Sequence, residues 1–113
     1  MRAGDVVLVK FPFTSLVKDK KRPALVLKLT EHSSRIKLVT VAMITSKIDG
    51  YKIAGDVLMQ DWEEANLLHP SILRMSKIAT VDDVLIDQKL GSLSKKDMNL
   101  AKASFQRTFA DWV

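Results

Sequence analysis

The sequence predicts a mainly β protein, a half-open barrel of short strands that carries one α-helix at its C-terminal end. Two observations lead to this prediction. Apolar and β-branched runs of strand length recur between turn residues as far as about residue 90. After Gly91 the pattern changes to apolar residues three and four positions apart, the spacing of one helix face. The 113 residues contain no internal repeat or low-complexity linker, so we expect a single domain over residues 1–113.

Three strands are predicted in the first half of the chain. The first covers Asp5–Phe13 (DVVLVKFPF), is rich in β-branched and aromatic residues, and precedes a polar loop. The second runs from Pro23 to Leu29, since proline lacks an N–H and is confined to a strand start or an edge. The third, Ile36–Ile44, has apolar residues on both faces over its second half, which predicts a central, buried position.

Shorter elements are predicted in the second half. After the tight-turn pair at residues 49–50 (DG), a short strand lies within Ile53–Gln60, and further strands cover Ser71–Val81 and Leu85–Leu90. Residues 61–64 (DWEE) have the form of a capping box, an aspartate followed three positions later by a glutamate. This pattern predicts a helix of one or two turns between two strands.

The C-terminal helix has the clearest pattern. Residues 94–97 (SKKD) form a second capping-box pattern, which Leu93 and Met98 flank as a hydrophobic staple. Apolar side chains then follow at helical spacing over about five turns, and we expect this face to plug or flank the barrel. The apolar residues of this face are Met98, Ala101, Phe105, Phe109 and Trp112.

Composition limits the class of protein. Apolar residues make up 47% of the chain, which is ordinary for a globular protein, and no apolar run is long enough to span a bilayer. The first residues, MRAGDVVLVKF, are charged again at Asp5 and do not resemble a secretory signal. The absence of cysteine excludes disulfides, thiolate metal sites and a cysteine nucleophile. We therefore expect a cytoplasmic protein that does not act on a membrane.

Positive charge is concentrated in the first half of the chain. The net charge is +5, and residues 1–50 hold ten basic and four acidic side chains, against eight and nine in residues 51–113. The densest stretch is residues 18–22 (KDKKR). Such a patch favours encounter with the phosphates of a nucleic acid, although a solvated lysine-rich turn has the same composition.

Five sequence blocks resemble the MazF/PemK family of toxins. They are GDVVLVKFPFT at residues 4–14, KRPALVL at 21–27, AMITSK at 42–47, HPSILR at 69–74 and KLGSLS at 89–94. One such block is weak evidence, but five in the same order, across nearly the whole chain, are strong. The resemblance implies an SH3-like barrel with a C-terminal helix, a homodimer, and an endoribonuclease that a cognate antitoxin protein restrains.

The resemblance also implies the chemistry. Single-stranded RNA or mRNA is cut by its own 2′-hydroxyl, which leaves a 2′,3′-cyclic phosphate and a 5′-hydroxyl. The enzyme must align the attack, neutralise the phosphorane oxygens and manage two protons, and fixed cations can do this without a metal or other cofactor. His32 and His69 are far apart in sequence and lack a nearby ligand motif, so we predict no metal site, although a histidine pair remains possible in principle.

Arg22 and Thr45 are the predicted catalytic residues. Arg22 matches the family's catalytic arginine at the start of the second strand, and guanidinium grips phosphate with two hydrogen bonds. A guanidinium keeps its proton at neutral pH, so Arg22 is suited to stabilise the transition state and to donate a proton to the leaving oxygen, but not to accept one. Thr45 matches the family's threonine, whose hydroxyl would donate to a phosphate oxygen. The alternatives are that Arg22 only solvates its turn and that Ser46, next to Thr45, is the residue that matters.

Arg74 is a less certain match. In some family members an arginine here works with an acid two positions later, but this chain has Ser76 at that position. The departure leaves the general base unassigned. Arg74 either supplies a second phosphate contact or pairs with Asp82 or Asp83 on the surface.

The remaining predicted contacts concern the RNA backbone and bases. We expect the lysines of the basic stretch to hold backbone phosphates; they are Lys18, Lys20 and Lys21. Phe13 and Trp62 are candidates for base stacking, although packing in the core or a groove explains them better.

Two other functions stay open. A CcdB-like gyrase poison would use the same barrel and act through its C-terminal residues; this chain ends in an aromatic, Trp112, but lacks the Trp-Gly-Ile tail of those proteins. The missing acid near Arg74 also leaves open a non-catalytic RNA-binding relative. Neither the RNA cleavage motif nor the identity of the antitoxin follows from the sequence.

Overall fold

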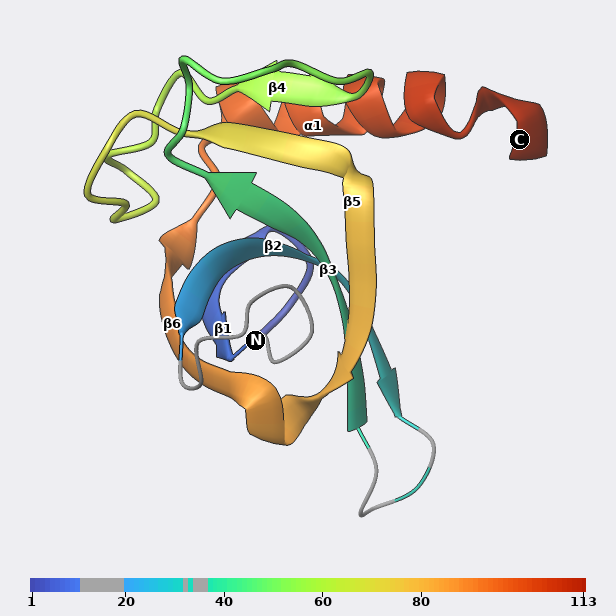
Figure 1. Cartoon of the computed structure of the whole chain (residues 1–113). Helices are drawn as coiled ribbons and strands as arrows, with labels where there is room; N and C mark the ends of the chain where they lie inside the picture. Colours follow the sequence, from blue (N-terminus) through green and yellow to red (C-terminus); the bar gives the residue numbers. More distant parts are fainter. Residues whose placement is uncertain (11–19, 32, 34–36) are drawn as a thin grey trace.

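The computed structural model describes residues 1–10, 20–31, 33 and 37–113, which form a curled antiparallel sheet with a helix along one side (Figure 1). The strands are β1 (Asp5–Lys10), β2 (Lys21–Glu31), β3 (Lys37–Thr45), β4 (Asp56–Leu58), β5 (Ile72–Asp82) and β6 (Ile86–Ser92). A short 3-10 helix, η1 (Asp83–Leu85), joins β5 to β6. The chain ends with α1 (Lys95–Thr108) and a second 3-10 helix, η2 (Ala110–Trp112).

The strands are hydrogen-bonded in the order β4-β5-β3-β2-β1-β6, and all neighbours are antiparallel. The edge strands β4 and β6 do not pair with each other within the described residues, so the sheet curls round without closing. The predicted half-open barrel with a C-terminal helix is therefore confirmed.

A bend in β5 produces much of this curl. Ala42 of β3 lies opposite Ile78, but the next residue, Met43, lies opposite Arg74. The residues between these partners, 75–77, are accommodated by a sharp turn of β5, seen in yellow in Figure 1. Beyond the turn, Arg74 also pairs with Asp56 of β4, so the Arg74 end of β5 lies between β3 and β4.

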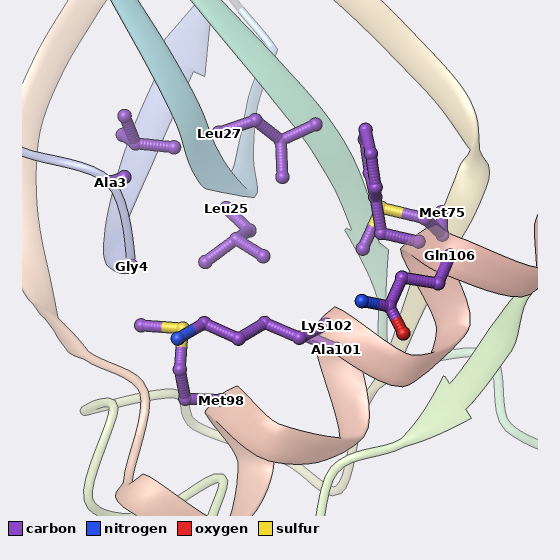
Figure 2. Close-up of a pocket in the computed structure, with 11 residues that line it drawn as sticks. Ala3, Gly4, Leu25, Leu27, Met75, Met98, Ala101, Lys102 and Gln106 are labelled. Atoms are coloured by element: carbon purple, nitrogen blue, oxygen red, sulfur yellow. The ribbon is translucent and has the colours of Figure 1, made fainter. Parts of the chain in front are cut away.

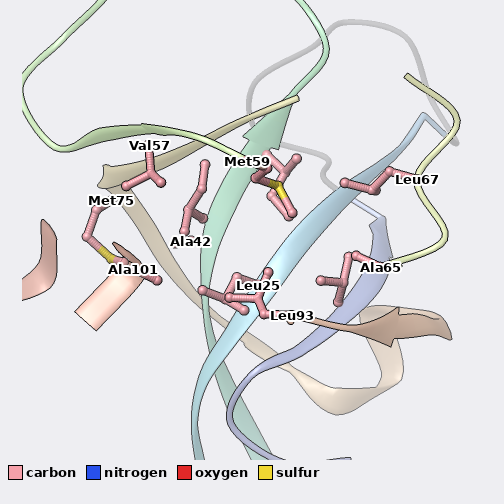
Figure 3. Close-up of a cluster of buried hydrophobic side chains, with 12 residues drawn as sticks. Leu25, Ala42, Val57, Met59, Ala65, Leu67, Met75, Leu93 and Ala101 are labelled. Carbon is pink, nitrogen blue, oxygen red and sulfur yellow. The ribbon is translucent and has the colours of Figure 1, made fainter. Parts of the chain in front are cut away.

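The core divides into two clusters because successive residues of the central strands face opposite sides of the sheet. Along β3, Val39, Val41 and Met43 belong to one cluster, whereas Ala42 and Ile44 belong to the other. The cluster in Figure 3 joins the sheet to α1 and to the connection between β4 and β5. The prediction that the third strand is central and buried on both faces is confirmed.

The N-terminus of α1 forms half of the predicted capping box. The Ser94 hydroxyl oxygen accepts from the backbone N–H of Asp97 at 3.1 Å, as expected for an N-cap. The Asp97 carboxylate does not return to the Ser94 backbone. It accepts from the backbone N–H groups of Gln60 and Asp61, both at 2.8 Å, and so joins the helix to the segment that follows β4.

The predicted apolar face of the helix is only partly buried. Ala101 is buried, and Met98 and Phe109 pack partly against the core, but Phe105 is 40% exposed and Trp112 is 89% exposed. The prediction is wrong for Trp112 because α1 ends at Thr108, and the change to η2 carries Trp112 away from the helix face.

Turns at residues 62–66 replace the predicted helix after Asp61. The Asp61 carboxylate accepts from the Ser94 hydroxyl at 2.6 Å, and the turns end at Asn66, whose φ of 58° does not continue a helix. Trp62, partly buried, packs against the Figure 3 cluster, which confirms the packing explanation for this residue.

Most strand boundaries lie within a few residues of the prediction. The second strand is longer at both ends than Pro23–Leu29, and the last begins at Ile86 because η1 occupies Leu85. The predicted end of the first strand, near Pro12, lies outside the described residues. No helix among the described residues is long and apolar enough to cross a membrane.

Candidate active site

The pairing of β2 with β3 brings Arg22 and Thr45 together. Ala24 lies opposite Met43 in this antiparallel pair. Extending the same register by two residues places Arg22, near the start of β2, opposite Thr45, at the end of β3. Residues opposite each other on neighbouring strands have Cβ atoms about 4.5–5.5 Å apart, so the two predicted catalytic side chains are neighbours.

Two pockets meet at this pair of residues. The larger, of about 540 Å³, extends towards the loops before β2 and β5, and the smaller, of about 310 Å³, extends towards β5 and residues 50–51. Four residues line both pockets: Arg22, Ile44, Thr45 and Lys47. Within the described residues, neither lining includes an aspartate or a glutamate. The pockets thus form a cationic groove with Arg22 and Thr45 at its middle.

Both central side chains have unused hydrogen-bonding capacity. The Arg22 side chain is half-buried, and its Nε is buried without a hydrogen-bond partner among the residues that the structure describes. A buried guanidinium N–H in this state favours an incoming acceptor such as a phosphate oxygen. The Thr45 oxygen accepts from the Lys47 backbone N–H at 3.2 Å, which leaves its own proton free to donate.

Some of the residues predicted to contact the RNA line the larger pocket, and the others lie outside the described residues. Lys20, Lys21 and Ser46 line the larger pocket and are exposed. The Lys21 ammonium also lies 3.1 Å from an Asp87 carboxylate oxygen, an exposed pair that water screens. Lys18, Phe13 and His32 lie outside the described residues.

The chain resembles known proteins in sequence and in fold. A family model described as "PemK-like, MazF-like toxin of type II toxin-antitoxin system" matches residues 2–109, nearly the whole chain. The chain belongs to this family. No match was found among the curated protein sequences.

Solved structures of similar proteins share the fold of this PemK/MazF-like toxin. A mycobacterial endoribonuclease in complex with its cognate antitoxin is 14% identical, with a TM-score of 0.71 over 97% of this chain and 95% of that one. The Mycobacterium tuberculosis toxin MazF-mt6 is 21% identical, with a TM-score of 0.68 over 94% and 96% of the two chains. MazF from Deinococcus radiodurans is 17% identical, with a TM-score of 0.67 over 97% and 96%.

Arg74 of the toxin lines the smaller pocket but is held by other groups. It is only 7% exposed, its Nη2 donates to the Tyr51 carbonyl at 2.7 Å, and its guanidinium lies 4.6 Å from the centre of the Tyr51 ring. Its Nε is 3.6 Å from an Asp56 carboxylate oxygen. The alternative of a surface pair with Asp82 or Asp83 is therefore wrong, because β5 carries Arg74 inward beside β4.

Ser76, at the position where some relatives have an acid, faces away from the pockets. Its hydroxyl donates to the Ala54 carbonyl oxygen, and it lines neither pocket. The nearby Gly55 has φ of +94°, and a Cβ there would lie 2.8 Å from both the Ser76 and the Thr108 hydroxyl oxygens. Ser76 therefore has a structural contact in this toxin, between β5 and the loop before β4.

The structure adds residues to the site that the sequence did not place there, and of these only His69 was named from the sequence, as half of a pair with His32. Lys47 lines both pockets, and His69, Asn66 and Gln88 line the larger one. Lys47 and His69 lie inside the family-like blocks AMITSK and HPSILR, so the blocks contained a signal for both. Asn66 and Gln88 lie outside those blocks, and only the fold brings them to the groove.

A third, apolar pocket of about 310 Å³ lies between the N-terminal residues, β2 and α1 (Figure 2). Its wall includes Leu25, Leu27, Met98 and Ala101, and it contains none of the predicted site residues. A reaction at phosphate needs cations and hydrogen-bond donors, which this pocket offers only at Lys102 and Gln106 on its rim. The cationic groove is therefore the candidate active site.

Proposed function

We propose that this toxin is an endoribonuclease that cleaves single-stranded RNA without a metal. The observation that carries the proposal is the position of Arg22 and Thr45, side by side where two cation-lined pockets meet. Family membership supports it, and so do two mycobacterial endoribonucleases with this fold.

In the proposed reaction the 2′-oxygen of one ribose attacks the adjacent phosphorus. Arg22 binds the non-bridging oxygens and stabilises the charge that develops on them, while the Thr45 hydroxyl donates to one of these oxygens. Arg22 also supplies the proton that the leaving 5′-oxygen takes up, because an alkoxide is a stronger base than a neutral guanidine. The products are a 2′,3′-cyclic phosphate and a 5′-hydroxyl end.

The remaining cations hold the strand in the groove. Lys20 and Lys21 lie on the larger-pocket side of Arg22, and Lys47 lies beside Thr45, so phosphates next to the cleaved one meet positive charge. Ser46 is exposed beside Thr45 and offers a further donor. Arg74 reinforces the positive field of the smaller pocket although its own hydrogen bonds go to the protein.

A cleavage assay in the presence of EDTA tests the proposal. Purified wild-type protein should cut RNA and leave cyclic-phosphate ends, and Arg22→Ala and Thr45→Ala should each lower the rate by about 10²–10³-fold, since each removes a donor to the phosphorane. Arg107→Ala is the matched control, because Arg107 is an exposed arginine of α1 that lines neither pocket. Equal rates for all four proteins would refute the assigned site.

A gyrase poison is the second candidate, and one observation favours it. Trp112 and Val113 are 89% and 88% exposed at the end of the chain, where CcdB-like proteins act. The two functions separate in parallel reactions with wild-type protein. Intact RNA together with trapped gyrase–DNA complexes would support the poison, and an RNA-binding protein without catalysis would retain RNA but release no cyclic-phosphate ends.

We also propose two protein partners. Structures with this fold include an endoribonuclease with its cognate antitoxin and a MazE–MazF complex from Deinococcus radiodurans. For this toxin we propose an antitoxin whose acidic, disordered segment folds onto the cationic groove and covers Arg22. We further propose a homodimer, which would bury additional apolar surface of a small core; light scattering should then give twice the chain mass of 12.7 kDa.

A further inference from the structure

Among the residues that the structure describes, the charged groups of the cationic groove include no evident proton acceptor. The proposed reaction removes a proton from the 2′-hydroxyl, yet the charged side chains that line the two pockets are lysines and arginines, which carry their protons at neutral pH. The hydroxyl of Ser76, at the position of the family's acid, is bound to the Ala54 carbonyl outside the groove. Within the described part of the chain, the candidates for a general base are therefore the uncharged residues of the pocket wall.

His69 is the described residue of the groove with the required chemistry. It lies between β4 and β5 in the wall of the larger pocket, which Arg22 and Thr45 also line. A neutral imidazole accepts a proton through one ring nitrogen, and imidazoles ordinarily titrate at about pH 6.5, which suits general base catalysis near neutrality. The other hydrogen-bonding side chains of this wall, such as Asn66 and Gln88, are amides or hydroxyls and are poor bases.

The backbone carbonyl of His69 is hydrogen-bonded, whereas its imidazole ring has no hydrogen-bond partner among the described residues. The His69 carbonyl oxygen accepts from the hydroxyl of Ser71 at 2.8 Å, and Ser71 is buried at 3% exposure directly before β5. His69 itself is exposed, and across the described part of the chain its imidazole makes no hydrogen bond or ion pair. The residue is thus held at the pocket wall with both ring nitrogens available to a substrate.

We propose that His69 is the general base of this toxin, an inference that rests on the proposed ribonuclease function. Its imidazole takes the 2′-hydroxyl proton as the O2′–P bond forms. The P–O5′ bond breaks, and the leaving oxygen takes a proton from the Arg22 guanidinium. His69 then releases its proton to solvent and Arg22 takes one up, so both residues return to their starting protonation states. The RNA is left with one 2′,3′-cyclic phosphate end and one 5′-hydroxyl end.

Of the described residues, the charged ones that line the larger pocket with His69 are all basic, and one of them, Lys21, is paired with Asp87 outside the lining. Lys20, Lys21 and Arg22 face the larger pocket from the start of β2, and Lys47 faces it from the end of β3. Imidazole is the side chain that ordinarily changes its charge near neutral pH, so the base should dominate the pH dependence of the rate between about pH 5 and about pH 8.

Single-turnover cleavage across this pH range tests the inference. For wild type, the logarithm of the rate should rise with slope one on the acid side and then level off. His69→Asn should lower the plateau by about 10²–10⁴-fold and abolish the acid limb. In His69→Ala, added imidazole should restore cleavage in proportion to its neutral form, a response that a purely structural residue would not give.

Controls separate the inference from the proposed function. Glu64→Gln changes an exposed side chain of the same β4–β5 connection outside both pockets and should keep the wild-type rate and profile. Suppose that the wild type cleaves RNA to cyclic-phosphate ends, but His69→Asn keeps the full rate or an unchanged acid limb. This result would overturn the role of His69 and leave the ribonuclease function standing. Intact RNA with wild-type protein would overturn the ribonuclease function and this inference together.

Discussion

The cations of the groove differ in how tightly the protein holds them, and Arg74 is held most tightly. Its guanidinium donates to one backbone carbonyl, stacks on Tyr51 and lies 3.6 Å from Asp56, whose side chain is only 9% exposed. The Nε atoms of both Arg22 and Arg74 are buried without a hydrogen-bond partner, but within the described residues Arg22 makes none of the other contacts that hold Arg74. The groove therefore combines one arginine committed to the fold with one available to a substrate.

Replacing Arg74 should destabilise the protein as well as weaken RNA binding. Arg74→Met leaves the buried Asp56 carboxylate without its counter-charge, and we expect the free energy of unfolding to fall by about 3–5 kcal/mol. Asp56→Asn in the same chain should recover much of the loss, because the amide still accepts from the Ile53 N–H but carries no charge. Urea unfolding of the two single variants and the double variant measures this coupling, and additive losses would refute it.

Asp5 should make the stability of the fold sensitive to acid. Burial raises the pKa of its carboxyl, but hydrogen bonds from the Arg2 N–H and the Ser92 hydroxyl, with the Lys89 ammonium at 3.4 Å, outweigh burial and lower the pKa below its ordinary 3.8. A lowered pKa in the folded state stabilises the fold above pH 3.8, and this stabilisation is lost as the pH falls through the folded-state pKa.

The comparison with Asp5→Asn isolates this effect. The wild type should exceed the variant in free energy of unfolding at neutral pH, and the gap should shrink in urea titrations carried out progressively below pH 3.8. If the difference in free energy of unfolding between the two proteins stays constant over that range, the surrounding donors do not stabilise the charged form of Asp5.

At the level of elements, one carboxylate joins α1 to the segment after β4. Asp97 is 2% exposed and accepts from the backbone N–H groups of Gln60 and Asp61. Asp97→Ala leaves both donors unsatisfied and should lower the free energy of unfolding by about 2–4 kcal/mol. Lys96→Ala, an exposed change in the same helical turn, should alter it by less than about 0.5 kcal/mol. Matching urea midpoints for the two variants would contradict the assigned role of Asp97.

The same element shows how far the sequence could predict the fold. The start of α1 follows from local pattern, because the Ser94 hydroxyl caps the N–H of a residue three positions away. The partners of the Asp97 carboxylate lie 36 and 37 positions away, and a local pattern has no information on such a contact. Asp61 is a second example. It has a good capping sequence, but its carboxylate binds Ser94, 33 positions away, and no helix begins there.

The candidate site was predictable to a similar extent. The family-like blocks pointed to Arg22 and Thr45, but their proximity depends on the register of β2 and β3, which only the fold specifies. His69 was considered as half of a pair with His32 and as a metal ligand, because sequence spacing offers no other test for a lone histidine. Its place in the pocket wall results from the path of the chain between β4 and β5.

For the whole molecule, the concentration of charge matters more than the net value of +5. The basic excess lies in residues 1–50, and the ends of β2 and β3 bring part of it to one groove with Arg22 and Thr45 at its middle. In the described residues two lining cations are paired, Lys21 with Asp87 and Arg74 with Asp56, but no carboxylate lines the groove itself, so its field stays positive. A polyanion should therefore bind there with a strong dependence on salt.

The salt dependence of RNA binding measures how many phosphates the groove contacts. For single-stranded RNA, each neutralised phosphate should contribute a slope of about 0.7 in the logarithm of affinity against the logarithm of salt concentration. Lys20→Gln and Lys47→Gln should each reduce the slope by about this amount if each lysine holds one phosphate. Lys95→Gln, at an exposed position of α1 outside both pockets, should leave it unchanged. Titration of a non-cleavable RNA, with a 2′-methoxy group at each ribose, separates binding from catalysis. Equal slopes for the three variants and the wild type would place the RNA elsewhere on the surface.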